Sequence, residues 1–202
     1  MAKVQPEDES VTPAYPAGAF TAAPPRGAVR PILGLLILGA AVSVALGVYG
    51  NLHEPRGVAI NVAGFSGPLQ VKVWLTTGAF GLALVQLLSA FAMYGKVPGF
   101  DAGDGTARLH RWSGRLAFLL TVPVAMHCLY ALGFQDYDTR TMVHSLLGCA
   151  FFGAFTAKML SLTKEGMPGW LLPLFGGTVF AVLTGLWLSS AYWFFSTTGV
   201  QF

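Results

Sequence analysis

The sequence predicts an all-α, polytopic membrane protein with five transmembrane helices. Apolar residues make up 54% of its 202 residues, whereas charged residues make up only 10%, against roughly 25% in a soluble domain. The charges also avoid five apolar windows, in which Lys158 is the single charged side chain. Each window is as long as the roughly 17–25 residues that cross a hydrocarbon core, and none alternates as a barrel strand would. The windows are residues 32–49, 73–93, 116–134, 142–162 and 168–195.

Two regions are expected along the chain. Residues 1–30 are rich in Pro, Ala and acidic residues and lack helical periodicity, which is typical of a segment that cannot bury enough apolar surface to fold. We therefore expect a disordered cytoplasmic tail at 1–30 and a five-helix transmembrane domain at 31–202. The first apolar stretch begins near Ile32 and is long enough to span, so it is expected to remain as an anchor rather than to be cleaved as a signal peptide.

The distribution of Lys and Arg predicts the orientation, because basic residues near the ends of spans resist translocation. With the N-terminus inside and the C-terminus outside, nine basic residues face inwards and three face outwards. The inner set is Lys3, Arg26, Arg30, Lys96, Arg108, Arg111, Arg115, Lys158 and Lys164, and the outer set is Arg56, Lys72 and Arg140. We expect a multi-pass protein of the plasma (cytoplasmic) membrane, which interacts with the lipid bilayer and not with nucleic acid.

Small residues recur at four-residue spacing in two windows, and such stripes let helices approach closely in lipid. The first stripe is Gly39, Ser43 and Gly47, and the second is Gly177, Ala181, Gly185 and Ser189. Both are expected to mediate helix packing.

Pro123 is expected to kink the third helix and to free a carbonyl one turn earlier, and Pro173 is a candidate for the same effect in the fifth. Cys128 and Cys149 both fall inside predicted spans and have no CxxC neighbour. They are expected to be free thiols with an apolar packing role.

Two of the four histidines are expected to lie at one depth. His127 lies about seven residues before the outer end of the third helix, which places it about 10 Å deep. His144 lies about six residues after Asp138, the expected N-cap of the fourth helix, which places it about 9 Å deep from the same side. Consecutive antiparallel helices therefore bring the two imidazoles to the same level.

This arrangement predicts a bis-histidine haem b site. Such a site needs two neutral imidazoles, one on each side of the iron, held by rigid helices around an apolar macrocycle. Gly148 lies one helical turn below His144 and is expected to leave a flat place for the porphyrin. The alternative is that His127 and His144 each satisfy an interhelical hydrogen bond and hold no cofactor.

Three further polar residues are candidates with other or several open uses. His110 is 17 residues from His127 on the same helix, or about 25 Å, so it belongs to the inner interface. His53 lies in the outer loop, and three uses stay open for it: an alternative haem ligand, a proton acceptor for a quinol, or a solvated side chain. Gln86 is expected to bond across the bundle or to line a quinone-sized cleft.

The stretch LHRWSGRLAFLLTVPVAMHCLYALGF, followed by RTMVHSLLGCAFFGAFTAKMLSL, resembles b-type membrane cytochromes of the cytochrome b561 and ferric-reductase-like kind. It also resembles an uncharacterised family of short actinobacterial membrane proteins with an HRWSGRLAF motif, from roughly Pro55 to Leu160. The cytochrome resemblance implies haem on His127 and His144 and one-electron transfer. The chain departs from those cytochromes in lacking a histidine for a second, inner haem.

The sequence thus predicts a haem b electron-transfer subunit, with one haem near the outer face and a redox partner subunit or a quinone as its partner. It does not identify a stand-alone enzyme, because no Ser, Asp or Glu accompanies the histidines in a hydrolytic constellation. The alternative function is a cofactor-free accessory or assembly subunit of a larger membrane complex of the respiratory type. A transporter is disfavoured by the few intramembrane polar groups and the lack of a visible repeat.

Overall fold

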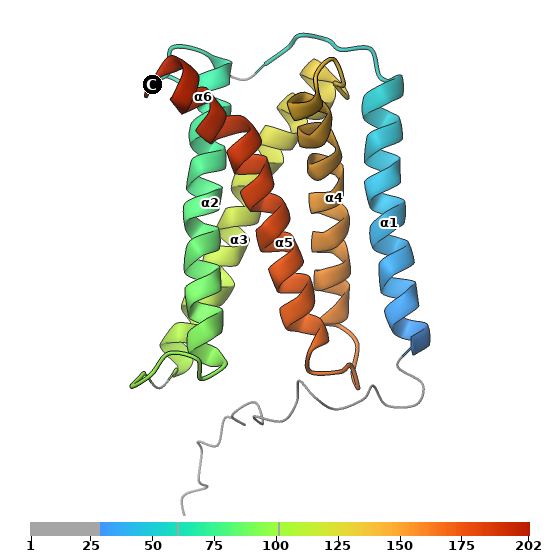
Figure 1. Cartoon of the computed structure of the whole chain (residues 1–202), viewed down its shortest axis with the longest axis vertical. Coiled ribbons are helices and arrows are strands. Elements are labelled where there is room, and N and C mark those ends of the chain that lie inside the picture. The colour runs from blue at the N-terminus through green and yellow to red at the C-terminus, as the bar shows by residue number, and fades with distance from the viewer. Residues whose placement is uncertain (1–28, 60, 101) are drawn as a thin grey trace, which may run out of the picture.

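The computed structural model describes residues 29–59, 61–100 and 102–202, and this part of the chain is helical with no strand (Figure 1). The helices are α1 (Val29–Leu52), α2 (Pro68–Met93), α3 (Asp104–Met126), α4 (Thr139–Ser161), α5 (Leu171–Trp187) and α6 (Trp193–Thr198). Two π-helical segments, η1 (His127–Leu132) and η2 (Leu188–Tyr192), continue α3 and α5 without a break.

Five continuous helical rods in the described residues are long and apolar enough to cross a membrane. The rods are Val29–Leu52, Pro68–Met93, Asp104–Leu132, Thr139–Ser161 and Leu171–Thr198. The expected fold class is therefore confirmed. Most of the expected tail, residues 1–28, lies outside the described residues, and Val29 and Arg30 already belong to α1.

The rods run alternately up and down (Figure 1), and their contacts close into a ring, because η1 at the end of the third rod also meets α1. The main packing pairs are α2 with α3, α1 with α4, and α4 with α5, and α2 also meets α5. The spans α3 and α4 are consecutive in sequence but have no comparable backbone contact, so they face each other across a space that side chains line.

Helices α1 and α4 approach so closely that their backbones meet, which only small residues permit. A Cβ on Gly153 would collide with the Ser43 hydroxyl and the Gly39 carbonyl oxygen, and a Cβ on Gly39 would lie 3.2 Å from the Ala157 Cβ. Since α1 exposes most of its other apolar side chains, this seam is its main attachment to the bundle. The first predicted small-residue stripe is thus used within the chain.

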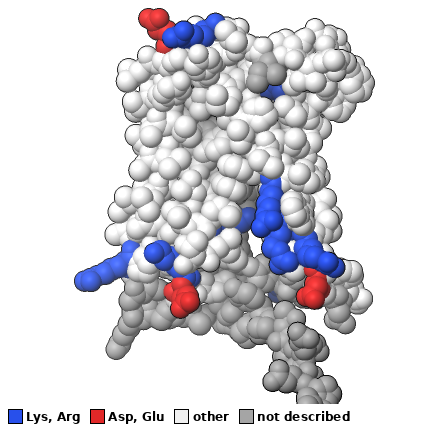
Figure 2. Space-filling view, turned by 180° about the vertical axis from the view of Figure 1, so that it is seen from behind, with Lys and Arg blue, Asp and Glu red and all other residues white. Residues whose placement is uncertain are grey.

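Charged side chains mark the two ends of the bundle differently. Figure 2 shows Lys and Arg gathered towards one end and sparse at the other. We call the first the Arg30 end, where α1 begins, and the second the His144 end. Among the described residues, the Arg30 end carries Arg30, Lys96, Arg108, Arg111, Arg115, Lys158 and Lys164, and the His144 end carries Arg56, Lys72 and Arg140.

The prolines and two glycines set where helices begin and end. Pro68 occupies the start of α2, and Pro173 lies in the first turn of α5, where a missing N–H leaves no interior carbonyl unpaired. Pro173 therefore does not produce the kink that the sequence suggested for the fifth helix. Gly133 ends η1 with φ +72° and Gly199 ends α6 with φ +79°, conformations that residues with a Cβ rarely adopt.

Replacing Gly153 with Ala is expected to weaken the α1–α4 seam, because the added methyl group has no room against the Gly39 carbonyl. Overpacking of this kind costs about 1–3 kcal/mol, which thermal unfolding in detergent will measure. Gly34→Ala is the matched control, since nothing lies within 4 Å of its added methyl group. An equal loss of stability in both variants would contradict a specific contact at Gly153.

Candidate functional site

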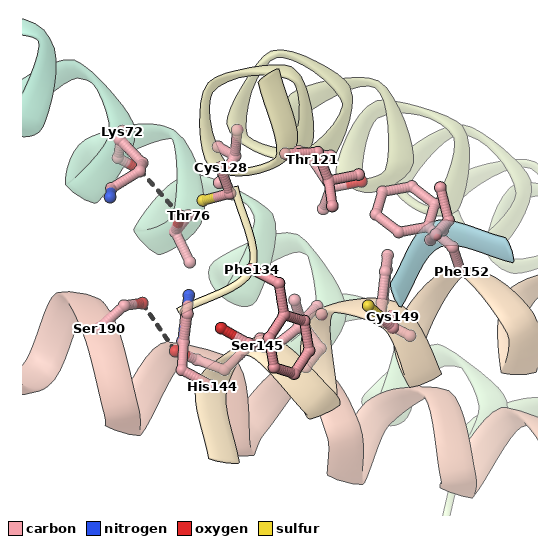
Figure 3. A pocket seen from close by; sticks show the side chains of 18 of the residues that line it. Lys72, Thr76, Thr121, Cys128, Phe134, His144, Ser145, Cys149, Phe152 and Ser190 are labelled. Carbon is pink, nitrogen blue, oxygen red and sulfur yellow. Dashed lines mark hydrogen bonds between the residues drawn. The ribbon is translucent and has the colours of Figure 1, made fainter. Parts of the chain in front are cut away.

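A cavity of about 100 Å³ lies inside the ring at the His144 end, between α3 and α4 (Figure 3). Every spanning rod contributes to its wall, from Leu46 on α1 to Ser190 on η2. Its apolar walls include Val124, Phe134, Phe151, Phe152, Leu183 and Leu186. Its polar lining is Lys72, Thr76, Thr121, His144, Ser145 and Ser190. The site is therefore a mainly apolar pocket with a few polar groups, which is the usual composition of a small-molecule or cofactor site.

His144 is held by a hydrogen bond that decides which ring nitrogen carries the proton. Its Nδ1 lies 2.9 Å from Ser189 Oγ on η2. Ser189 has one hydroxyl proton, and its Oγ lies 2.7 Å from the Gly185 carbonyl oxygen one turn earlier. We therefore assign the hydroxyl proton to that carbonyl and Ser189 Oγ as the acceptor of the bond from His144 Nδ1–H. The neutral imidazole then carries a free lone pair on Nε2.

Helices α4 and α5 approach each other closely at Gly185, one turn before this bond. A Cβ at Gly185 would lie 2.8 Å from Leu147 Cδ1, so a larger residue would force the Leu147 side chain to shift. Ser189 follows Gly185 by one turn and lies on the π-helical segment η2. The second small-residue stripe of the sequence thus continues into a functional polar residue at its last position.

The α3 wall of the cavity ends in the other π-helical segment, η1. Cys128 and Leu129 line the cavity, whereas His127, the first residue of η1, is half-buried and is not among the lining residues. The Lys72 ammonium nevertheless lies within electrostatic range of both His127 and His144. The structure thus has both histidines at the same end of the bundle, but only His144 is among the residues that line this cavity.

Both π-helical segments flank the same cavity, η1 on the α3 side and η2 on the α5 side. Single π-turns within α-helices are uncommon and occur frequently at functional sites. Sequence reasoning did not predict either segment. The available signal was Pro123, whose missing N–H disturbs the hydrogen bonds of α3 one turn before η1 begins.

Gly148 lies where the sequence placed it, one turn along α4 from His144 and in the cavity wall. No atom lies within 4 Å of a Cβ built on Gly148, so the space above its backbone is open. Phe151 and Phe152 line the same cavity. Both cysteines are free thiols, as expected.

His53 lies outside the cavity and closes the loop after α1 over the end of η1. Its ring is stacked between Tyr49 and Tyr130, with centroids 5.0 Å from each. Its Nε2–H donates to the Tyr130 carbonyl oxygen over 3.2 Å. His53 thus holds the loop on η1 and contributes no group to the cavity.

A second polar cluster lies at the Arg30 end, between α2 and α3. Ser89 Oγ lies 2.7 Å from the Val85 carbonyl oxygen, and His110 Nδ1 bonds to the same Oγ over 2.9 Å. Gln86 Nε2 bonds to the His110 carbonyl oxygen and to Ser113 Oγ on the same helix. Gln86 therefore bonds across the bundle, one of its two expected uses.

The comparisons with known proteins identify a family and no function. The model of DUF6529, described as a family of unknown function, matches residues 32–202. The chain belongs to the DUF6529 family. The family match contains the Pro55 to Leu160 region that resembled uncharacterised membrane proteins, whereas no cytochrome b561 family is found. Neither a curated protein nor a solved structure matches this DUF6529 chain.

The expected N-cap of α4 is present in this DUF6529 fold. Asp138 Oδ1 accepts from the Thr141 backbone N–H at 2.9 Å, and Oδ2 accepts from the Thr141 hydroxyl at 2.6 Å. These two bonds lower the pKa of the Asp138 carboxyl below its ordinary value, and the nearby Arg140 adds to the effect. The cap therefore sets the start of the helix that carries His144 six residues later.

Asp138→Ala is expected to lower the melting temperature at pH 7 by removing this cap. Because the folded-state pKa is depressed, the charged cap stabilises the fold above the ordinary pKa of Asp and loses this effect as pH falls through the folded value. The difference in melting temperature between wild type and variant should therefore shrink on acidification below about pH 4. A difference that stays constant down to pH 2 would contradict a role for the ionised carboxylate.

Proposed function

We propose that this protein is a membrane haem b electron-transfer subunit whose haem lies in the cavity at the His144 end, with His144 and His127 as axial ligands. The observation that carries the proposal is the free Nε2 of His144 at the wall of an intramembrane cavity. Haem supplies reversible one-electron transfer when it is bound. The likeness of residues 109–134 and 140–162 to b-type cytochromes supports the same assignment.

The donor chemistry of His144 fits an iron ligand. Histidines that bind metals almost always donate their other ring N–H to a fixed acceptor, which sets the tautomer and the ring orientation. Ser189 Oγ provides that acceptor for Nδ1–H. An imidazole used only for packing or for one interhelical bond gains nothing from a second nitrogen aimed at an open cavity.

The cavity is smaller than a bound macrocycle requires. Sites for ligands of cofactor size typically occupy about 300–1,000 Å³, and the cavity measures about 100 Å³. Binding therefore requires α3 and α4 to separate. These two helices share little backbone contact, whereas each is firmly packed on another neighbour. The open space over Gly148 lies on the same wall.

The opposite ligand belongs to η1. His127 is the predicted ligand and shares its end of the bundle and its Lys72 neighbour with His144. Cys128, the next residue, lines the cavity itself, and consecutive helical residues differ by about 100° around the axis. A rotation of η1 by about this amount is what coordination by His127 requires. Cys128 is therefore the variant that must be compared with His127.

The membrane orientation belongs to the same proposal. The Arg30 end carries most of the Lys and Arg residues (Figure 2), so it is assigned to the cytoplasmic side of the plasma membrane. The cavity then lies near the outer face. A single haem at this level exchanges electrons with a quinol or with an extracytoplasmic redox partner, because it does not reach across the bilayer.

A cofactor-free accessory or assembly subunit is the second candidate. The observation in its favour is that Gly177 and Ala181 of the second small-residue stripe are exposed on α5, where a partner helix has room to pack. Under this function, Gly177→Leu abolishes recovery of a partner complex and His144→Ala leaves it intact. Recovery unaffected by Gly177→Leu would contradict the accessory role.

The haem proposal predicts a visible spectrum for protein produced with haem supplied and purified in detergent. Wild-type protein should show a Soret band and, in the reduced-minus-oxidised difference, an α-band. His144→Ala and His127→Ala should each lose most of both. His110→Ala is the matched control, because His110 makes the same kind of bond to a serine at the other end and should keep the spectrum.

Three outcomes decide the proposal. Folded wild-type protein without a Soret band contradicts haem binding altogether. Loss of the band in Cys128→Ser with retention in His127→Ala contradicts the bis-histidine assignment and identifies the thiol as the second ligand. Retention in His144→Ala contradicts the site.

A further inference from the structure

We propose that Arg140 is the positioning residue for His144, acting through Ser189, so that the tautomer of His144 depends on a side chain that does not touch the cavity. The inference rests on the proposed function in one respect: the tautomer matters because Nε2 is the proposed iron ligand. Its geometric basis is a set of four contacts made by the Arg140 guanidinium.

The guanidinium is fixed on α4 from three sides. Its Cζ lies 4.0 Å from the centroid of the Trp193 ring, and Nη2 donates to Thr141 Oγ1 over 3.2 Å. Nη2 also lies 3.9 Å from the Asp138 carboxylate. A planar guanidinium held between a ring and two oxygens has little freedom left. Nη1, which takes part in none of these three contacts, therefore points in a fixed direction.

That direction is Ser189. Arg140 Nη1 donates to the Ser189 carbonyl oxygen over 2.8 Å, while His144 Nδ1 bonds to Ser189 Oγ over 2.9 Å. Arg140 and His144 are four residues apart on α4 and so share one face of the helix. Two residues on one face of α4 therefore bond to the same serine, Arg140 to its backbone and His144 to its side chain.

The need for such a clamp comes from η2. Ser189 lies within a π-helical segment between α5 and α6, and π-turns are rare compared with continuous α-helix. If η2 returned to α-helical winding, its residues would shift by up to one position, or about 100° around the axis. Ser189 Oγ would then leave His144. The Arg140 bond to Ser189 lies near the start of η2 and the Arg140–Trp193 contact lies directly after its end, so the two hold η2 from both ends and oppose this shift.

The consequence for His144 is chemical rather than only structural. With Ser189 in place, the proton stays on Nδ1 and Nε2 keeps its lone pair for a ligand. Without Ser189, the ring has no fixed acceptor at Nδ1, so the proton distributes over both nitrogens. The share of chains ready to bind iron through Nε2 then falls.

The first experiment reads the tautomer directly, in haem-free, full-length protein labelled with ¹⁵N-histidine in detergent. The ¹⁵N shifts of Nδ1 and Nε2 report which nitrogen carries the proton. Wild-type His144 should be predominantly Nδ1–H. Arg140→Gln and Ser189→Ala should both lower that share. Ser189→Ala removes the acceptor itself while leaving its carbonyl, and so the bond to Arg140, in place.

Two further variants separate positioning from charge. Arg140→Lys keeps the positive charge but lacks the planar fork that bonds Ser189 while resting on Trp193, so it should behave like Arg140→Gln. Arg56→Gln removes a cation from the exposed loop at the same end and should leave the tautomer unchanged. Wild-type behaviour in Arg140→Lys together with a loss in Arg140→Gln would overturn positioning in favour of a charge effect.

The second experiment uses haem-loaded protein and competition for haem by an excess of apomyoglobin. Loss of a residue that orients a metal ligand typically costs 10–100-fold in affinity, so Arg140→Gln should release haem at least about tenfold faster than Arg56→Gln. An unchanged tautomer in folded Arg140→Gln overturns the inference whether or not haem binds. If wild-type protein binds no haem but the tautomer responds as expected, the proposed function fails and the positioning of His144 stands.

Discussion

The structure depends on the requirement that polar groups inside the five spans find partners within the protein, because a hydrocarbon core offers no water. Among the described residues, no buried side-chain nitrogen or oxygen lacks a hydrogen bond. Most intramembrane Ser and Thr hydroxyls donate to a carbonyl three or four residues earlier on their own helix, as in Thr76 to Lys72 and Ser189 to Gly185. A hydroxyl that donates its proton in this way can only accept hydrogen bonds from its other neighbours. This local rule fixes how the histidines are used.

The same rule makes the two His–Ser pairs comparable and shows where they differ. His110 Nδ1 bonds to Ser89 Oγ and His144 Nδ1 bonds to Ser189 Oγ, and each serine also has a backbone carbonyl of its own helix as an acceptor. His144 lines the cavity, whereas His110 does not. The neighbouring helices also differ, because α2 and α3 are closely packed at His110 whereas α3 and α4 stand apart at His144. Equal local chemistry thus has different consequences at the two ends of the bundle.

The sequence was sufficient for the coarse features and for part of the site. Exclusion of charge from five windows predicted five spans, and Asp138 was correctly placed as the cap that sets the depth of His144. The face on which a residue lies was less accessible, because a shift of one residue turns a helix by about 100°. The π-helical segment η1 begins at His127, and Cys128 rather than His127 lines the cavity. Nothing in the local sequence encodes that choice beyond the perturbation at Pro123.

The hydrogen-bond partner of His144 could not be predicted from the sequence either, because Ser189 lies 45 residues further along the chain. Ser189 stood out only as the last member of a small-residue stripe, and Arg140 only as an outer cation. Their roles arise from the close approach of α4 and α5 at Gly185 and from the π-turn that follows it. Of this stripe, Gly185 and Ser189 lie where α4 and α5 approach each other and the polar atoms meet, whereas Gly177 and Ala181 are exposed.

Electron paramagnetic resonance of the oxidised protein tests the central claim most directly, because the ferric spectrum depends on both axial ligands. The account predicts one haem per chain with a low-spin signal typical of two imidazoles, lost in His144→Ala and shifted in Ser189→Ala. A folded wild-type protein without haem, or a haem whose signal survives His144→Ala, would contradict it.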